Sequence, residues 1–235
     1  MPQTHLTASA TGLVPVPVAV LLPTPAGQHA ESAVSHLPSW HGVTARDAAS
    51  LVRRLSTPDD LVIELDGHPT ITAAAEFLGR RASAVLPGVH ILGAAVPGQP
   101  VATWSSHPAG LIFAALPRPD VPPGDLAGLS AAMRTCRAGL RPGGYLLTAL
   151  TTSRLEHGGI EHPLIYRASV ITAARTAGLT WQQEWLVLTA PPPTDEPRAV
   201  PGPPLDLPSV LVDGRHLRVH RKLLAFRNDT GGRDA

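Results

Sequence analysis

The chain has little cysteine and little net charge for its 235 residues. Cys136 is the only cysteine, which excludes a disulfide framework and any zinc site built from cysteines of this chain alone. Its 19 Lys and Arg almost balance 18 Asp and Glu, so the net charge is +1. That balance excludes a strongly basic nucleic-acid footprint for the chain as a whole, and an acidic tail as well.

Long hydrophobic runs are also missing. The most apolar stretch near the start, residues 13–22, contains Pro15 and Pro17, and it is too short for a membrane-spanning helix, which needs about 20 apolar residues. No Lys or Arg precedes Arg46, so the positively charged start of a signal peptide is absent. We therefore expect a cytoplasmic protein with no membrane contact.

What the chain does have is enough apolar sequence for a packed core, with 43% hydrophobic and 16% charged residues. Residues 1–40 are rich in Pro, Ala and Thr without a sustained period, so we expect an irregular arm, in which residues 18–22 could form one short strand. Residues 41–228 are expected to form the domain, with an exposed Pro-rich loop at 191–208. Residues 229–235 are expected to be a disordered tail.

Within the domain, segments of helical periodicity alternate with short apolar runs. The clearest helix start is Thr44, because Thr44 and Asp47 fit a capping box. This alternation predicts an α/β fold, with a doubly wound, mostly parallel sheet covered on both faces. We expect helices at 44–57, 70–78, 125–140 and 164–177, and strands at 61–65, 82–86, 110–116, 145–150, 181–189 and 216–226.

Two details of this plan follow from local sequence. Residues 141–144, Arg-Pro-Gly-Gly, are expected to form a turn before their strand. The last two strands, 181–189 and 216–226, have no helix between them. Strands joined in this way most simply pair antiparallel, so we expect an antiparallel hairpin at one edge of the sheet.

Three stretches, taken in order, carry a resemblance to a known family: TPDDLVIE at 57–64, LGRRA at 78–82 and CRAGLRPGGYL at 136–146. The chain resembles the class I S-adenosylmethionine-dependent methyltransferases. More narrowly, it looks like the DNA N4-cytosine/N6-adenine methyltransferase branch and its relatives that modify RNA. The resemblance covers roughly residues 40–228. It implies a Rossmann-like methyltransferase fold, S-adenosylmethionine as the cofactor and a nucleic acid as the partner.

The resemblance also implies where the site lies. In open α/β sheets the ligand binds beyond the carboxyl ends of the strands. The loop after the strand at 61–65 would then receive the cofactor, and the turn after the strand at 110–116 would hold the amine and stack on a flipped base. The implied cofactor-binding residues are Glu64, Leu65, Asp66, Gly67 and His68, and the implied substrate-binding residues are Leu116, Pro117 and Arg118. The catalytic residues stay unknown, because transfer of an activated methyl needs little beyond proximity and orientation.

The sequence departs from the family pattern at each of these points. With Glu64 as the acidic residue that ends the strand, the two family glycines fall on His68 and Thr70. Residues 85–88 have no carboxylate for a ribose, and Ala-Leu-Pro-Arg at 115–118 replaces the Asp/Asn-Pro-Pro-Tyr turn. Two functions stay open. One is a divergent methyltransferase acting on DNA or another nucleic acid, and the other is a catalytically inactive binding or assembly module with this fold. A DNA-binding accessory protein is a third.

Single residues of the candidate site also have plain structural interpretations. Glu64 and Asp66 either contact the cofactor or belong to a turn, because Asp-Gly is a common turn pair. His68 is either a base or ligand, or a solvated turn residue.

The positions of the histidines and of the single cysteine do not indicate a metal site or a reactive thiol. His216 and His220 would lie about 13 Å apart on a strand, and no carboxylate cluster accompanies any histidine pair. Cys136 falls on the apolar face of its expected helix, where cysteine behaves as a small hydrophobic residue. We therefore expect no metal site and no thiolate nucleophile.

Overall fold

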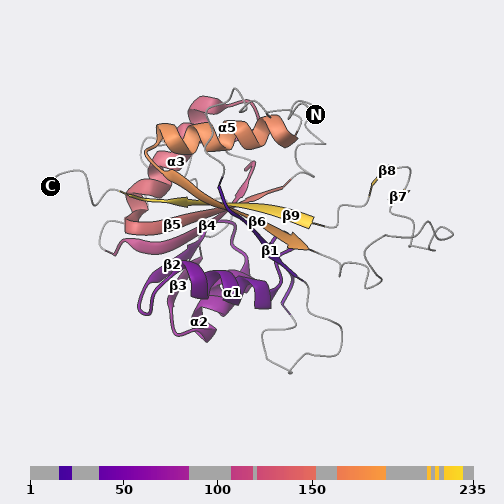
Figure 1. Cartoon of the computed structure of the whole chain (residues 1–235). Coiled ribbons are helices and arrows are strands. Elements are labelled where there is room, and N and C mark those ends of the chain that lie inside the picture. The colour runs from indigo at the N-terminus through magenta and orange to yellow at the C-terminus, as the bar shows by residue number, and fades with distance from the viewer. Residues whose placement is uncertain are drawn as a thin grey trace, which may run out of the picture.

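The computed structural model describes residues 16–22, 37–84, 107–118, 121–151, 163–188, 211–212, 215–216 and 220–229. These residues form a seven-stranded sheet with helices on both faces, and a separate pair of short strands (Figure 1). The strand order is β1-β6-β9-β5-β4-β2-β3. The strands are β1 Val18–Leu21, β2 Leu61–Glu64, β3 Arg81–Ala84, β4 Ala109–Leu116, β5 Leu140–Leu150, β6 Thr180–Leu188 and β9 His220–Arg227. The helices are α1 Ala45–Leu55, α2 Pro69–Phe77, α3 Leu126–Gly139 and α5 Pro163–Thr176.

The directions of the strands confirm the predicted doubly wound sheet. Within the main sheet only β9 runs antiparallel, and it pairs with both β5 and β6. All other pairs are parallel. The predicted antiparallel pair is therefore present as β6 and β9, but it does not form the edge of the sheet, because β1 lies beyond β6.

Strand β1 comes from residues that the sequence placed in an irregular arm. It pairs parallel with β6 in the register Val18 to Glu184 and Leu21 to Val187. The strand is only four residues long, with Pro17 before it and Pro23 shortly after it. Short length and flanking prolines are typical of edge strands, because they limit pairing with further chains.

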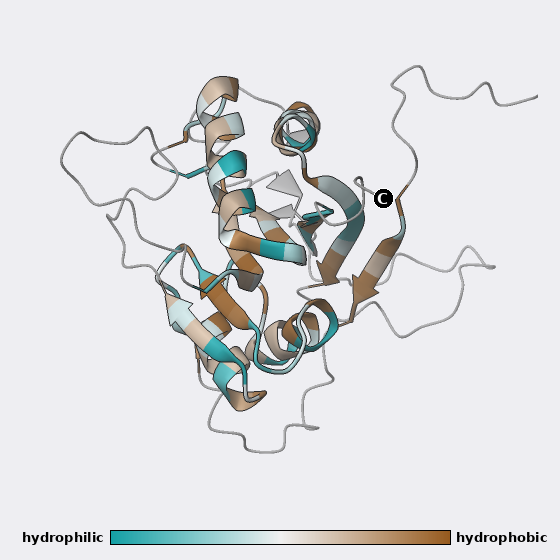
Figure 2. Ribbon diagram, turned by 90° about the vertical axis from the view of Figure 1, so that its left-hand side faces the viewer, coloured by the Kyte–Doolittle hydropathy of each residue, from teal (hydrophilic) through white to brown (hydrophobic). Residues whose placement is uncertain are grey.

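Two hydrophobic cores lie on the two faces of the sheet. One packs α1 and α2 on the sheet and includes Leu51, Ile71 and Phe113. The other packs α3 and α5 on the opposite face and includes Tyr166 and Phe226. Several strands of the sheet are hydrophobic in colour over part of their length (Figure 2), and all eight residues of β4 are buried. This burial of both faces explains why β4 reads as a continuous apolar run.

The helix starts follow their predicted caps. Thr44 Oγ1 accepts a hydrogen bond from Asp47 N at 3.2 Å, and the Asp47 carboxylate in turn accepts from Thr44, which confirms the capping box. Asp125 caps α3 by accepting from Gly128 N at 2.8 Å. Cys136 is buried, and burial raises the pKa of its thiol to about 12. Its predicted role as a small hydrophobic residue is therefore confirmed.

The structure corrects the prediction of a turn at residues 141–144. These residues belong to β5, which begins at Leu140. The register between β4 and β5 shifts at this point, and Gly143 has a φ of +73°. Asn228 holds the irregular segment, because Gly143 N donates to Asn228 O at 2.7 Å and Asn228 Nδ2 donates to Leu140 O at 3.1 Å. The glycines thus form an irregular start to the strand where a turn was expected.

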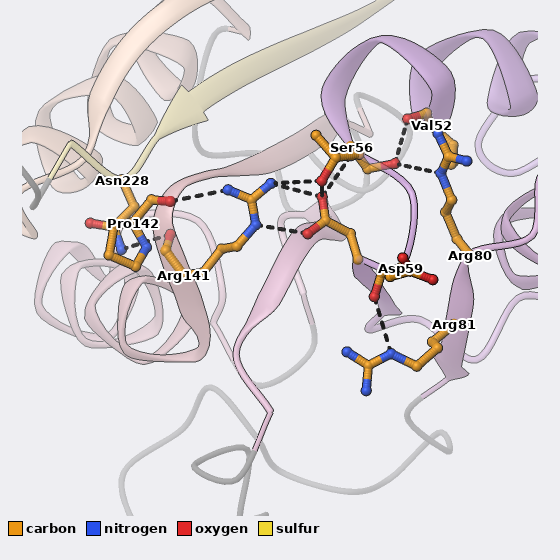
Figure 3. A network of polar contacts seen from close by, with 10 residues as sticks. Val52, Ser56, Asp59, Arg80, Arg81, Arg141, Pro142 and Asn228 are labelled. Atoms are coloured by element: carbon orange, nitrogen blue, oxygen red, sulfur yellow. Dashed lines mark hydrogen bonds and ion pairs between the residues drawn. The ribbon is translucent and has the colours of Figure 1, made fainter.

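A clasp of Asp60, Thr57 and Arg141 joins the two sequence stretches TPDD and RPGG. Figure 3 shows the Arg141 side chain with the dashed lines of its contacts. Arg141 Nε and Nη2 donate to the two carboxylate oxygens of Asp60 at 2.7 and 2.8 Å. Thr57 N donates to the same carboxylate at 2.6 Å. A Cβ on Gly110 would lie 2.2 Å from the Asp60 carboxyl carbon, so the clasp requires glycine there.

The end of the chain differs from the expected strand 216–226. Residues Arg215–His216 form β8, which pairs with β7 at Leu211–Val212, whereas β9 begins at His220. The Pro-rich loop 191–208 and residues 85–86 of the expected second strand lie outside the described residues. No described helix is long and apolar enough to cross a membrane.

Candidate functional site

The candidate site lies where β2 and β4 end, as the strand pattern predicts. Glu64 is the last residue of β2, and its side chain is fully buried. Its Oε1 accepts hydrogen bonds from Trp40 Nε1 at 3.1 Å and from Asp66 N at 2.8 Å. Its Oε2 accepts from His68 N at 2.7 Å. Both carboxylate oxygens of Glu64 are thus used to hold the chain's own loop.

Asp66 ties this loop to the end of β4. Its Oδ2 accepts from Ala115 N at 2.8 Å and from Trp40 Nε1 at 3.3 Å. Its Oδ1 accepts from Arg118 Nη1 at 2.8 Å in an ion pair with little exposure on either side chain. His41 Nε2 lies 3.7 Å from Oδ2, which is an ion-pair distance and too long for a hydrogen bond.

The pKa values of the two carboxyl groups are shifted in opposite directions. Burial raises the pKa of Glu64 to about 7, and the nearby Asp66 charge also raises it. The backbone hydrogen bonds that Glu64 accepts lower its pKa, but by less. Burial would raise the pKa of Asp66 too, but His41, the Arg118 charge and the Ala115 amide outweigh that effect and lower it. At neutral pH Asp66 therefore carries its charge and is paired with Arg118.

The predicted cofactor loop, residues 64–68, forms a turn whose amides donate to the Glu64 carboxylate at its start. Gly67 has a φ of +70°, which suits the predicted Asp-Gly turn. His68 is the N-cap of α2, where its Nδ1 accepts from Thr70 N at 3.4 Å. Burial lowers the pKa of His68, so the ring is neutral at physiological pH. The side chain of Leu65 is buried in the core on the α3 and α5 side.

The predicted substrate turn is only partly at the site. Arg118 reaches Asp66, as described above. The side chain of Leu116 is 1% exposed and packs in the core. Pro117 follows it through a cis peptide bond. Of the residues predicted to bind ligands, the structure therefore brings together the side chains of Glu64, Asp66, His68 and Arg118.

Trp40 is the residue of this site that sequence reasoning missed. It is fully buried and packs edge-on against Phe113 of β4, with ring centroids 5.3 Å apart. Its indole N–H faces both Glu64 and Asp66. Hydrophobic periodicity gives no signal for Trp40, because it precedes the first helix in a segment without a period. The one available cue was a large aromatic residue directly before a His-Gly pair.

The residues present do not fit the amino-acid end of S-adenosylmethionine. Such a ligand would approach the backbone closely at this loop. The amides of Asp66, His68 and Ala115 already donate to the chain's own carboxylates. Arg118, the cation that could meet a ligand carboxylate, is paired with Asp66. The described residues also offer no group of three or more side chains that could hold a metal ion.

Comparisons with known proteins give similarity of fold alone. No family profile and no curated protein sequence matches the chain. Among solved structures, TrmN from Thermus thermophilus matches 79% of this chain with a TM-score of 0.45 and 13% identity. The match covers about half (49%) of the length of TrmN. The N-methyltransferase NodS from Bradyrhizobium japonicum WM9, in complex with S-adenosylhomocysteine, matches with a TM-score of 0.40 and 14% identity over 78% of this chain and 86% of NodS.

The antibiotic-resistance methyltransferase Kmr matches with a TM-score of 0.39 and 18% identity over 77% of this chain and 92% of Kmr. The chain is thus distantly similar in fold to these three structures. These similarities indicate no substrate, and they do not favour the DNA methyltransferase branch.

Proposed function

We propose that this protein is a binding or assembly module that has kept a methyltransferase-like fold without use of the methyl donor. The observation that carries the proposal is the bonding of Asp66. Its carboxylate takes the Ala115 amide and the Arg118 guanidinium, both at 2.8 Å. These are contacts that would otherwise face the donor, and Trp40 completes them from a third segment.

The energetic argument concerns the cost of opening this loop. Separation of Asp66 from Arg118 would leave a largely buried charge without its partner, which costs about 3 kcal/mol or more. A cost of that size lowers ligand affinity about 100-fold or more, because each 1.4 kcal/mol is a factor of about ten.

The second candidate is a divergent methyltransferase that acts on DNA or another nucleic acid. Its supporting observation is the position of Glu64 at the end of β2, next to β4 in the sheet. Such an enzyme would hold the donor over the loop 64–68 and the acceptor over residues 116–118. The two candidates differ in one measurable property, which is binding of the donor or its product.

The experiment is calorimetric titration of the full chain with S-adenosylhomocysteine at neutral pH, together with a thermal shift at about 1 mM ligand. NodS, whose structure holds this ligand, serves as the positive control. We expect no binding heat and no shift in Tm for this protein. A Kd of about 10 µM or tighter would overturn the proposal, because ligand at about 100 times Kd adds about 2.7 kcal/mol of stability.

Three variants locate any binding that does occur. Glu64→Ala and Asp66→Ala remove the carboxylates of the loop, and Asp47→Ala removes an exposed carboxylate of the α1 capping box as the matched control. Wild-type binding that is lost in the first two variants and kept in Asp47→Ala would place the donor at this loop. That result would establish the methyltransferase candidate in place of the module.

A further inference from the structure

The two helices on one face of the sheet carry positive charge only. Helices α3 and α5 contain Arg134, Arg137, Arg167 and Arg175 and no Asp or Glu. The helices on the other face, α1 and α2, carry residues of both signs. Because the whole chain has a net charge of only +1, the α3 and α5 layer is a local concentration of positive charge.

Three of these arginines, Arg134, Arg137 and Arg175, belong to the C-terminal halves of the two adjacent helices. The guanidinium of Arg137 in α3 reaches Gly178, just after α5, and lies 3.0 Å from where a Cβ of that glycine would stand. Gly178 N donates to Arg175 O at 2.9 Å, so the backbone of Arg175 lies within one turn of the glycine that Arg137 reaches. Arg134 precedes Arg137 by one helical turn on the same side of α3. Figure 1 shows α3 and α5 next to each other over one face of the sheet.

These three residues, which we call the arginine cluster, have no carboxylate partner within the part of the chain that the structure describes. The fourth arginine, Arg167, is different, because it is paired with Glu184. Arg134 and Arg175 are exposed, and Arg137 is half-buried. Among the described residues, no carboxylate therefore neutralises the charge of the cluster.

Stabilisation of the helix ends does not explain the whole cluster. Arg137 and Arg175 lie in the last turns of their helices, where a cation contributes about 0.3–1 kcal/mol through the helix dipole. Arg134 lies outside that last turn. At the other end of α3 the carboxylate of Asp125 caps the helix, and the first turn of α5 has no acidic residue.

The surroundings of the cluster favour a phosphate backbone over a protein surface. Protein interfaces usually have a hydrophobic core, but the exposed large hydrophobic residues of these helices, Leu126 and Ile165, lie at their opposite, N-terminal ends. Single-stranded nucleic acid is usually held by aromatic stacking, and the one aromatic residue of the two helices, Tyr166, is buried. Guanidinium groups match phosphates in bidentate geometry, and duplex DNA presents a dense row of them.

We infer that the arginine cluster at the ends of α3 and α5 binds the phosphate backbone of duplex DNA. Such contacts position a protein on DNA without reading its sequence. The inference does not depend on loss of methyl-donor binding, because the cluster lies on a different surface from the loop at Glu64 and Asp66. A DNA result of either sign leaves the titration with S-adenosylhomocysteine unaffected.

The test is fluorescence anisotropy of a labelled duplex of mixed sequence with the full chain over a series of salt concentrations. The variant is Arg134→Gln/Arg137→Gln/Arg175→Gln. The matched control, Arg46→Gln/Arg53→Gln/Arg81→Gln, removes the same charge from other parts of the surface. We expect the slope of log K against log salt to fall by about 2.7 in the cluster variant, at about 0.9 per lost phosphate contact, and to fall less in the control.

Three outcomes would overturn the inference. The first is that wild-type protein does not bind the duplex at low salt, and the second is that the slope falls equally in the control variant. The third is that the protein binds single-stranded RNA or an acidic protein more tightly than the duplex. Thermal unfolding of each variant checks that its fold is intact. If the half-buried Arg137 proves necessary for folding, the double variant Arg134→Gln/Arg175→Gln changes only exposed side chains. Its slope is then expected to fall by about 1.8.

Discussion

Replacement of Arg141 by alanine tests whether the clasp between the TPDD and RPGG stretches holds the sheet together. Arg141 makes two charge-assisted hydrogen bonds to Asp60, whose side chain is only 9% exposed. Without the guanidinium, this carboxylate keeps only the hydrogen bonds from Thr57 N and Oγ1. Loss of one partner from a fully buried ion pair costs about 3–5 kcal/mol.

The expected cost here is smaller, because solvent reaches part of the pair. Arg141 is 31% exposed, so we expect Arg141→Ala to lower the free energy of unfolding by about 2–3 kcal/mol. The pKa of Asp60 supports this size. Burial acts to raise it, but the hydrogen bonds from Arg141 and Thr57 outweigh burial and lower it from 3.8 to about 2. A shift of that size corresponds to about 2 kcal/mol for Arg141 and Thr57 together, after the opposing effect of burial.

The assay is urea unfolding followed by tryptophan fluorescence, at neutral pH and at several acidic pH values. Because the pKa of Asp60 is lower in the folded state, its contribution is present above about pH 4 and is lost as the pH falls toward 2. Arg141→Ala should therefore lose stability at neutral pH and lose less on acidification than wild type. Arg134→Ala, which removes an exposed arginine of α3, is the matched control, with an expected change within about 0.5 kcal/mol.

Two results would refute this reasoning. One is a loss of less than about 1 kcal/mol at neutral pH in Arg141→Ala, which is the range of an exposed ion pair. The other is an acid dependence that is the same in wild type and variant. Either would mean that Asp60 is solvated or satisfied by other groups.

Two further predictions concern the candidate site. Burial raises the pKa of Glu64 from 4.5 to about 7, so its contribution to stability is fully present below about pH 4.5 and is lost as the pH rises through 7, by up to about 3 kcal/mol. In Glu64→Gln the free energy of unfolding should therefore change less with pH than in wild type. An equal dependence on pH in the two proteins would contradict this. Trp40→Phe should lower the free energy of unfolding by at least about 1 kcal/mol more than Trp185→Phe. The reason is that the Trp40 N–H donates to two carboxylates, whereas the Trp185 N–H has no partner among the described residues. Equal losses of stability in denaturant unfolding would show that only ring packing matters.

The local pattern of the sequence was sufficient for most of the fold. Thr44 and Asp47 mark the start of α1, since a capping box depends only on residues three positions apart. The uninterrupted apolar run of β4 predicts a strand buried on both faces, because only such a strand needs hydrophobic residues at every position. The position of Glu64 and Asp66 at the end of a strand likewise follows from the chain order.

Tertiary structure decided what those carboxylates do. The ion pair between Asp66 and Arg118 joins residues that are 52 positions apart, and no local pattern encodes which cation a carboxylate meets. Trp40 enters the site from a segment without a period, and β1 joins the sheet only because β6 has a free edge there. The closed loop therefore depends on long-range packing, whereas the sequence alone determined the strands and helices that bring its parts together.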